Sequence, residues 1–390
     1  MSKLKNLIQQ LCPDGVEYKK LAECCALEKG TTPIQKAVPG EYPLVVTTEE
    51  RKASNTYQFE KPTVCIPLIS SRGHGVASLN SLFYQEGRFA LGNILCGVTS
   101  INGDELSAKF LFYYLNHKKD TLIVPLMRGG ANVSLTIDSL KNIKVPVPPI
   151  SVQDEIVRIF DEFEALGIAL TAELTARQLQ YEYYNGILLS LKNVEYQTLE
   201  ELCDIVDYRG KTPRKVDSGI FLVTAKNIRK GFIDYGKSQE YIAPEDYDDV
   251  MRRGKPKIGD VLFTTEAPCG NVAQVDNENI ALAQRVIKYR PKSSNLNSTF
   301  LKYALLGKEF QEKLDKAATG ETVKGIKGSK LHQLTIPVPP IEEQERIVAI
   351  LDRFNELCND LSSGLPAEIE VRRKQYEYYR DKLLTFKQLS

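Results

Sequence analysis

The amino-acid sequence contains one passage twice. Residues 146–166 read PVPPISVQDEIVRIFDEFEAL and residues 337–357 read PVPPIEEQERIVAILDRFNEL, with 12 of the 21 aligned positions identical. The copies lie 191 residues apart, about half of the 390-residue chain. Solenoid repeats recur every roughly 20–50 residues, so this longer period indicates two homologous halves instead. We therefore predict pseudo-two-fold symmetry and one task performed at two places.

Weaker repeats frame each half. The pentapeptide QYEYY occurs at residues 180–184 and 375–379, an offset of 195 that makes the second copy four residues longer. Upstream, residues 17–33 and 195–213 both begin with Glu-Tyr, share a leucine and a cysteine, and end in Gly-x-Thr-Pro. Between these landmarks the halves diverge, apart from one patch, KFLFYYL against TFLKYAL. The sequence thus predicts shared boundaries around two variable segments.

The variable segments have the character of strands. They hold short runs rich in β-branched and aromatic residues between Gly, Pro and Asn, namely YPLVVT, TVCIPLI, IFLVTA, DVLFTT and NIALAQRVIKY. Pro-Val-Pro-Pro ends each segment because proline cannot continue a ladder, and acidic residues then open a helix.

We predict an α+β fold with two pseudo-two-fold-related, mixed, strand-rich domains that are joined and spaced by two long antiparallel coiled-coil helices. The predicted segments are residues 1–150 (first domain), 151–193 (central spacer helix), 194–341 (second domain) and 342–390 (a C-terminal helix that pairs with the central one).

The central helix carries a heptad seam. Steps of alternately four and three residues from Ile156 to Leu188 reach ten positions, and eight of these hold apolar or aromatic residues. This is a coiled-coil pattern sustained over ~50 Å. The second copy starts in step, is interrupted at residues 362–366, and resumes out of register like a stutter. The alternative is a helix that only covers its own domain. The predicted helix–helix or partner contacts are Ile156, Phe160, Phe163, Leu170, Leu174, Tyr181, Tyr184, Ile347, Leu351, Phe354, Leu361, Tyr376 and Tyr379.

Composition limits the class of protein. Hydrophobic content of 42% and charged content of 26% are ordinary for a globular chain. No apolar run approaches the roughly 20 residues of a membrane span, and the N-terminus lacks the apolar core of a signal peptide, so we expect a cytoplasmic protein without a membrane partner. Eight cysteines without a CxxC pair and three histidines predict buried thiols and no metal site.

Enzyme motifs are weak. Residues 231–238, GFIDYGKS, match the phosphate-loop pattern GxxxxGK[ST]. A phosphate loop must follow a buried strand and open a helix, whereas this segment is β-prone and is soon followed by Pro244. We interpret it as a strand and turn. No methyltransferase signature, nucleophile elbow or HExxH is present, so we predict no catalytic residues and no cofactor held by this chain.

The remaining candidate functional residues are basic and polar residues on Gly-flanked loops. A net charge of +1 argues against non-specific coating of nucleic acid but allows a local basic face. Residues 207–230 contain seven basic residues against two acids. Such side chains suit base edges and phosphates. The candidate DNA contacts are Thr31, Thr32, Thr48, Arg51, Lys52, Arg72, His74, Arg88, Arg128, Asn132, Arg209, Lys211, Thr212, Arg214, Lys226, Asn227, Arg229, Lys230, Gln284, Arg285, Lys324 and Lys327.

The order of variable segment, PVPPI-x-x-Q helix, variable segment and PVPPI-x-x-Q helix, with QYEYY, resembles the DNA specificity (S) subunits of type I restriction-modification systems. The resemblance covers essentially the whole chain, and TAELTA at residues 171–176 is similar to a short repeat that some members carry. It implies that each variable domain recognises one half of a split double-stranded DNA target. It also implies that the helices pair, set the spacing and dock two methyltransferase (M) subunits.

The same resemblance implies that S-adenosylmethionine, ATP and Mg²⁺ belong to the M subunits and the restriction (R) subunits. Two other classes stay open on the residues alone. One is a nucleotide-binding enzyme that uses the phosphate-loop match, and the other is a coiled-coil scaffold without a role in DNA binding.

Overall fold

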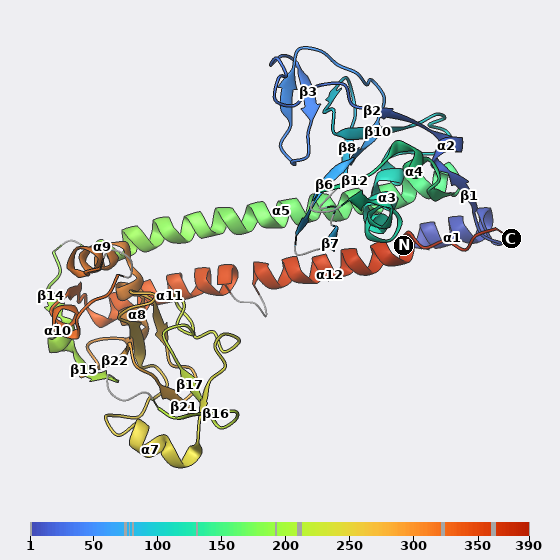
Figure 1. The fold of residues 1–390 in the computed structure, drawn as a ribbon. Helices are drawn as coiled ribbons and strands as arrows, with labels where there is room; N and C mark the ends of the chain where they lie inside the picture. The colour runs from blue at the N-terminus through green and yellow to red at the C-terminus, as the bar shows by residue number, and fades with distance from the viewer. Residues whose placement is uncertain are drawn as a thin grey trace. The chain divides into compact units, whose positions relative to one another are not determined.

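The structure is a computed structural model that describes residues 2–73, 76–77, 79, 82–129, 132–191, 193–208, 213–320, 324–359 and 364–389. The chain divides into two compact units, which are unit 1 (Met1–Leu170 with Ile369–Ser390) and unit 2 (Thr171–Glu368). Each unit combines one strand-rich domain with the stretches of long helix that pack on it (Figure 1).

The main sheets of the two units have the same topology. In unit 1 four antiparallel strands follow the order β2 (Cys25–Lys29), β10 (Leu95–Ser100), β5 (Thr63–Pro67) and β8 (Phe83–Gln85). In unit 2 the equivalent order is β15 (Cys203–Asp207), β22 (Val286–Pro291), β19 (Val261–Thr264) and β20 (Val272–Gln274). The two halves therefore share a fold where their sequences diverge.

A second, smaller sheet in each unit contains one parallel pair. In unit 1 this sheet is β4 (Lys52–Ser54), β3 (Tyr42–Val45) and β9 (Ala90–Leu91), with β3 and β9 parallel. In unit 2 it is β16 (Lys215–Val216), β18 (Tyr241–Ile242), β17 (Ile220–Val223) and β21 (Ile280–Leu282), with β17 and β21 parallel. All five runs predicted as strands contain strands, so this prediction is confirmed.

The repeated boundary segments pair with each other. In unit 1, β1 (Glu17–Lys20) runs antiparallel to β13 (Lys144–Val147), so the Glu-Tyr segment lies against Pro-Val-Pro-Pro. In unit 2, β14 (Tyr196–Thr198) lies in the same way against β23 (Thr335–Pro337). Each domain is thus closed at its base by a two-stranded ladder that leads directly into a long helix.

Shorter elements complete each unit. Unit 1 also contains α1 (Ser2–Leu11), α2 (Leu21–Cys24), β6 (Ile69–Gly73), β7 (Val76–Ala77), α3 (Ala108–Leu122), η1 (Val124–Leu126), β11 (Arg128–Gly129), β12 (Asn132–Ser134) and α4 (Ile137–Lys141). Unit 2 also contains α6 (Leu199–Leu202), η2 (Pro244–Asp246), α7 (Tyr247–Val250), α8 (Ser298–Leu306), α9 (Lys308–Ala317) and α10 (Gly328–His332). All eight cysteines are free thiols and seven are buried, as predicted, while Cys269 is half-buried.

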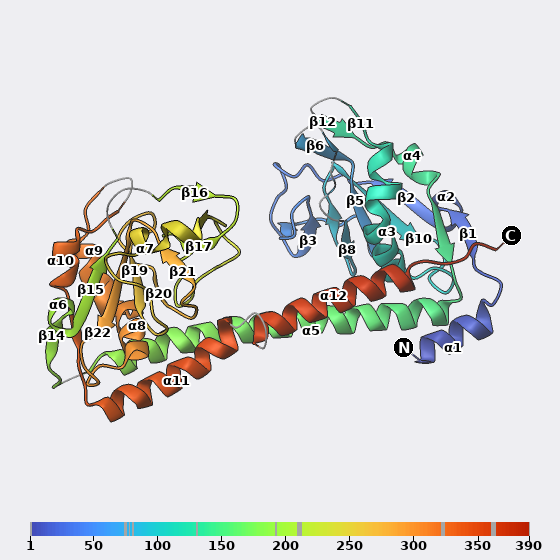
Figure 2. The ribbon, with the colours of Figure 1, turned by 90° about the horizontal axis from the view of Figure 1, so that it is seen from below.

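The described residues form three long helices, of which the first two directly follow the Pro-Pro pairs. They are α5 (Ile150–Leu189), α11 (Ile341–Asn359) and α12 (Leu365–Leu383). Figures 1 and 2 show α12 antiparallel to the first part of α5 in unit 1, and α11 antiparallel to the later part of α5 in unit 2. The prediction of one C-terminal helix over residues 342–390 was wrong, because the structure has two helices and then an extended tail.

The predicted seam is confirmed by burial and ring contacts. On α5, every seam position from Ile156 to Leu188 is buried or half-buried except Tyr184. In unit 1 the ring centroids of Phe163 and Tyr379 lie 5.8 Å apart, and in unit 2 those of Tyr184 and Phe354 lie 5.5 Å apart. The alternative of helices that only cover their own domains is therefore wrong. Leu361 and the interruption at residues 360–363 lie outside the described residues.

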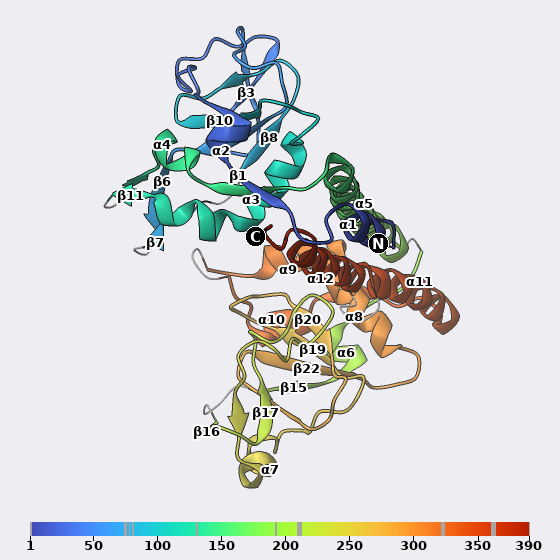
Figure 3. The ribbon, with the colours of Figure 1, turned by 90° about the vertical axis from the view of Figure 1, so that its right-hand side faces the viewer.

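The C-terminal tail belongs to the first domain. Val16 forms a parallel bridge with Gln388, and the Val16 N–H donates to the carbonyl of Lys387 at 2.8 Å. Figure 3 shows both chain ends in unit 1, beside α1 and α12. Within the described part of the chain, no helix combines the length and apolar character that crossing a bilayer requires.

Candidate nucleic-acid interface

The Gly-x-Thr-Pro turn of unit 1 is tied to its own loop. The Thr31 hydroxyl donates to Gln58 Oε1 at 3.0 Å, and Gln58 Nε2 donates to the Lys29 carbonyl at 2.9 Å. The Thr32 N–H donates to the carbonyl of Leu91 at 3.1 Å. Both threonines therefore shape the turn, while the Thr31 side chain is exposed at its surface.

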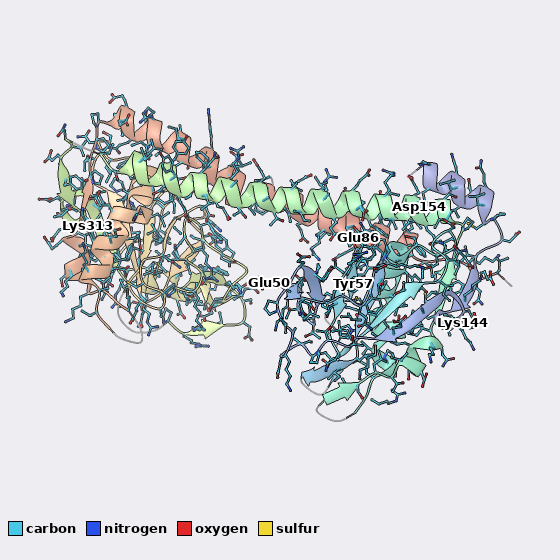
Figure 4. The ribbon with its side chains drawn as sticks, turned by 90° about the horizontal axis from the view of Figure 1, so that it is seen from above. Glu50, Tyr57, Glu86, Lys144, Asp154 and Lys313 are labelled. Atoms are coloured by element: carbon cyan, nitrogen blue, oxygen red, sulfur yellow. The ribbon has the colours of Figure 1, made fainter. Side chains whose placement is uncertain are left out.

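Arg51 and Arg88 lie on neighbouring loops of unit 1 in different settings. Arg51 Nε donates to Gln85 Oε1 at 3.0 Å and its guanidinium lies 5.2 Å from the centre of the Phe83 ring. The Arg88 guanidinium lies 5.1 Å from the centre of the Tyr57 ring, which Figure 4 labels, and is more than half exposed. Thr48 and Lys52 are exposed. Arg51 thus stabilises its loop, and Arg88 offers its charge to solvent.

The structure gathers three more predicted residues into one small sheet. Its strand order is β11–β12–β6–β7, and its register places Asn132 opposite Ser71 and Arg72 opposite Ala77. Arg128, on β11, is exposed and donates from Nη1 to the carbonyl of Pro125. Residues that are 60 positions apart in sequence therefore share one sheet. His74 lies outside the described residues.

The basic segment at 207–230 is described in part. Arg209, Lys211 and Thr212 lie outside the described residues. Arg214, Lys226 and Lys230 are exposed, and Arg229 Nε lies 3.6 Å from a carboxylate oxygen of Asp234. The described cations of this segment thus reach solvent from β16 and from the loop after β17.

Asn227 is the exception in this segment. Its side chain is completely buried. Its Oδ1 accepts from the backbone N–H and the hydroxyl of Thr224, at 2.9 and 2.7 Å, and its Nδ2 donates to the carbonyls of Asp234 and Lys237. All of its hydrogen-bonding groups are used to close the loop, so Asn227 is removed from the candidate DNA contacts.

Three predicted residues of unit 2, Arg285, Lys324 and Lys327, lie at or next to one open pocket. The Thr265 N–H donates to the Arg285 carbonyl at 3.0 Å, and the Ile326 N–H donates to the Thr265 carbonyl at 3.0 Å. The pocket, of about 310 Å³, is lined by Thr265, Glu266, Thr319 and residues 325–328. Around it Arg285 pairs with Glu266 at 2.8 Å and Lys324 pairs with Asp315 at 2.9 Å. Lys327 is exposed and Gln284 half-buried.

The phosphate-loop match is not a phosphate loop. Ile228 and Ile233 form an antiparallel bridge, and the segment after Ser238 continues into β18 instead of opening a helix. Backbone N–H groups at a helix N-terminus, which hold the phosphates in such loops, are therefore missing at residues 231–238, all of which the structure describes. The segment is a turn with one isolated bridge at Ile233 and contains no strand, so only the turn of the strand-and-turn interpretation is confirmed. The nucleotide-binding alternative loses its only motif.

Two buried glutamines, whose roles the sequence did not reveal, explain the Q of PVPPI-x-x-Q. Gln153 and Gln344 are both 0% exposed. Gln153 Oε1 accepts from the Ser107 N–H at 2.8 Å, and its Nε2 donates to the carbonyls of Glu105 and Pro148, both at 2.7 Å. Each of these contacts ties the first turn of α5 to the domain before it.

Gln344 repeats this arrangement in unit 2. Its Oε1 accepts from the Asn297 N–H, and its Nε2 donates to the carbonyls of Asn295 and Pro339, all at 2.8 Å. Ser107 and Asn297 are the N-cap residues of α3 and α8. The repetition of Gln in both PVPPI motifs was the signal. One partner of each glutamine, the carbonyl of Pro148 or Pro339, lies within the motif, but the other two lie about 47 residues upstream and are not visible in it.

A tyrosine and an aspartate form a second repeated tie. The Tyr113 hydroxyl on α3 donates to Asp161 Oδ1 on α5 at 2.6 Å, and the Tyr303 hydroxyl on α8 donates to Asp352 Oδ1 on α11 at 2.6 Å. Burial and these carboxylates raise the pKa of both tyrosines well above the ordinary value, so the hydroxyls remain donors. The repeated patch KFLFYYL/TFLKYAL contains these tyrosines, so that patch marks the contact between domain and helix.

Comparison with known proteins decides the family. A family model described as the type I restriction modification DNA specificity domain matches residues 13–177 and again residues 192–371. The chain belongs to this family. It is a DNA specificity subunit of a type I restriction-modification system, and the specificity subunits of the known family are non-catalytic.

Two relatives match most of the chain. A type I restriction enzyme specificity subunit of Escherichia coli is 35% identical over 317 residues, which are 74% of this chain and 73% of that protein. A Haemophilus influenzae protein named as a type I restriction enzyme specificity subunit is 30% identical over 394 residues, covering 95% of this chain and 96% of that protein.

The fold is shared with solved structures. The crystal structure of the S subunit of a type I restriction-modification system from M. genitalium matches with a TM-score of 0.56 at 16% identity and covers 95% of each chain. A chain from a structural study of type I complex assembly matches with a TM-score of 0.53 at 18% identity, covering 95% of this chain and 98% of that one. At these identities the likeness concerns the fold alone.

Proposed function

We propose that each strand-rich domain of this specificity subunit reads one half of a bipartite double-stranded DNA target. The observation that carries the proposal is that both units keep the same sheet topology while the segments between the repeated boundaries diverge. A shared scaffold with different loops is what two different half-sites require, because base edges are read by side chains and not by the fold.

The charge of the loops supports this proposal. In unit 1 Arg88 and Arg128 are exposed, and Arg128 shares a small sheet with Arg72. In unit 2 the basic segment at 207–230 exposes Arg214, Lys226 and Lys230. The ion pairs of Arg88 and Arg285 are exposed, and such pairs contribute little to stability. These arginines can therefore exchange a carboxylate for a DNA phosphate without a large loss of folding stability.

Removing the exposed cations of unit 2 tests the proposal. We expect Arg214→Ala, Lys226→Ala and Lys230→Ala to weaken DNA binding by the complex with its methyltransferase subunits. A residue that contacts a base edge should cost about 1–3 kcal/mol and relax the choice of base in one half-site. A residue that contacts a phosphate should weaken all sequences alike and lower the salt slope by about one unit. Binding titrations at several salt concentrations separate the two cases.

The exposed Lys237 provides the matched control. It lies in the turn before β18, and Lys237→Ala should leave both DNA affinity and DNA-stimulated ATP use of the full complex unchanged. Wild-type affinity and salt slope in the triple variant would remove this surface from the DNA interface. Loss of ATP use in Lys237→Ala would revive the nucleotide-binding alternative.

The long helices are the proposed docking surface for two methyltransferase subunits, with restriction subunits joining the complex. Tyr183 on α5 and Tyr378 on α12 occupy the same place in the two QYEYY copies and are 65% and 59% exposed. Large exposed aromatic side chains are typical of interfaces, and their repetition fits two copies of one partner. In this assembly S-adenosylmethionine, ATP and Mg²⁺ are held by the partner subunits.

Shortening these tyrosines should reduce partner binding one site at a time. Tyr183→Ala or Tyr378→Ala alone should leave one methyltransferase bound, and the double variant should lose both, because a buried aromatic anchor contributes about 2 kcal/mol or more. Native mass spectrometry of the reconstituted complex measures the stoichiometry. Tyr183→Phe and Tyr378→Phe keep the rings and serve as controls. Two bound subunits in the double alanine variant would contradict this docking surface.

A further inference from the structure

The junction between each domain and its helix is built in the same way twice. Gln153, which precedes the Asp154 labelled on the first turns of α5 in Figure 4, uses its whole amide group on three backbone partners, and Gln344 does the same on α11. The segments that supply most of these partners diverge between the halves. The contacts are made to backbone groups, which explains how one glutamine fits two different domains.

A second contact lies further along each helix. Asp161 follows Gln153 by eight residues, and Asp352 follows Gln344 by eight residues, which is a separation of ~12 Å along the helix axis. At both points the helix is bonded to the domain, first through the N-cap of α3 or α8 and then through the tyrosine. One attachment point allows a domain to pivot, whereas two points fix its direction along the helix.

Small pivots matter for reading a split target. A domain of this size is roughly 30 Å across. A 10° rotation about its base therefore moves its far edge by ~5 Å, more than the 3.4 Å rise of one base pair along a DNA strand. A loosely attached domain would accept half-sites at several separations, and a fixed one would accept a single separation.

We propose that Gln153 and Gln344 are positioning residues that fix the direction of each recognition domain on its helix and thereby restrict the spacer length that the protein accepts. The proposal rests on the proposed function, since it assigns these residues a part in spacing and none in base contact. It differs from a role in stability alone because it predicts a change in selectivity between DNA spacers.

The test uses the specificity subunit in complex with its methyltransferase subunits. Gln153→Met with Gln344→Met keeps the length and volume of the side chains and removes the amide groups. Gln178→Met, at an exposed position of α5, is the matched control. The readout is the methylation rate on DNA with both half-sites fixed and the spacer shortened or lengthened by one or two base pairs.

We expect the ratio between the methylation rate at the native spacer and the rates at neighbouring spacers to fall ~10-fold. A change of this size corresponds to the free energy of one or two lost hydrogen bonds. The preference within each half-site should stay unchanged, and Gln178→Met should behave as the wild type. An unchanged spacer ratio in an active double variant would overturn the proposal.

A second pair of variants covers the case in which the glutamine variants fail to fold. Tyr113→Phe with Tyr303→Phe, combined with Lys109→Met and Lys302→Met, removes the groups of α3 and α8 that contact Asp161 and Asp352 and keeps the rings in place. Relaxed spacer selectivity in this pair supports two-point positioning, and wild-type selectivity overturns it. If the wild-type complex selects no DNA sequence, the proposed function is wrong. If the complex selects both half-sites but its spacer selectivity does not change in the glutamine variants, only the positioning role is wrong.

Discussion

Exchanging residues 34–145 for the corresponding segment of another specificity subunit should change one half of the DNA target and leave the other half intact. The exchanged segment contains β3 to β12, with the divergent loops of unit 1, and leaves β2, α5 and all of unit 2 in place. Each mismatched base pair costs about 1–3 kcal/mol, roughly additively, so a half-site of three base pairs should change preference by roughly 3–9 kcal/mol. Methylation mapping of the exchanged complex measures both halves at once.

The reciprocal exchange in unit 2 is the control for this prediction. Replacing residues 214–334, which lie between the second Gly-x-Thr-Pro turn and β23, should change only the other half-site. Changes in both halves from one exchange would mean that the two domains do not read independently. An unchanged target would mean that the variable segments do not read DNA.

Duplicating residues 171–174, Thr-Ala-Glu-Leu, should lengthen the non-specific spacer and leave both half-sites unchanged. The four residues lie within the continuous helix α5, immediately after the boundary between the two compact units, so the insertion leaves the core of each unit intact. Four residues add ~6 Å of rise and roughly 40° of net rotation to a helix. With 3.4 Å per base pair of DNA, the spacer should grow by about one or two base pairs. The smaller value is favoured because α11 and α12 keep their length.

A substitution that keeps the helix length is the control for this duplication. Thr171→Ala with Thr175→Ala alters the same exposed turn without adding residues and should leave the spacer unchanged. Methylation of DNA libraries with variable spacers compares the two variants. A native spacer in a fully active duplication variant would show that α5 does not set the separation, and altered half-sites would show that the helix takes part in reading bases.

Repetition and periodicity made the scaffold predictable from the sequence. The seam from Ile156 to Leu188 is visible because burial on a helix follows a fixed period, and the structure buries it with Tyr184 as the one exposed position. The strand runs are visible because β-branched and aromatic residues cluster there. The interruption at residues 362–366 was visible as a break in the heptad, but the end of α12 at Leu383 and the extended tail after it were not predicted.

Polar residues were less predictable, because their partners are set by contacts that are distant in the sequence. Asn227 resembles its exposed neighbours Lys226 and Lys230, yet its four hydrogen bonds close the loop between residues 224 and 237. Arg51 and Arg214 are both loop arginines, but only the structure distinguishes the one bonded to Gln85 from the one exposed to solvent. Composition therefore located the basic loops but did not distinguish the residues that bond within the protein from those that are exposed to solvent.

The most direct measurement of the central claim is the DNA target itself. The complex of this chain with its methyltransferase subunits is incubated with a library of random double-stranded DNA, and the methylated molecules are sequenced. The account predicts two short blocks of defined sequence, different from each other and separated by a spacer of constant length and free sequence. A single continuous block, or methylation without sequence preference, would contradict recognition by two domains held on a shared helical scaffold.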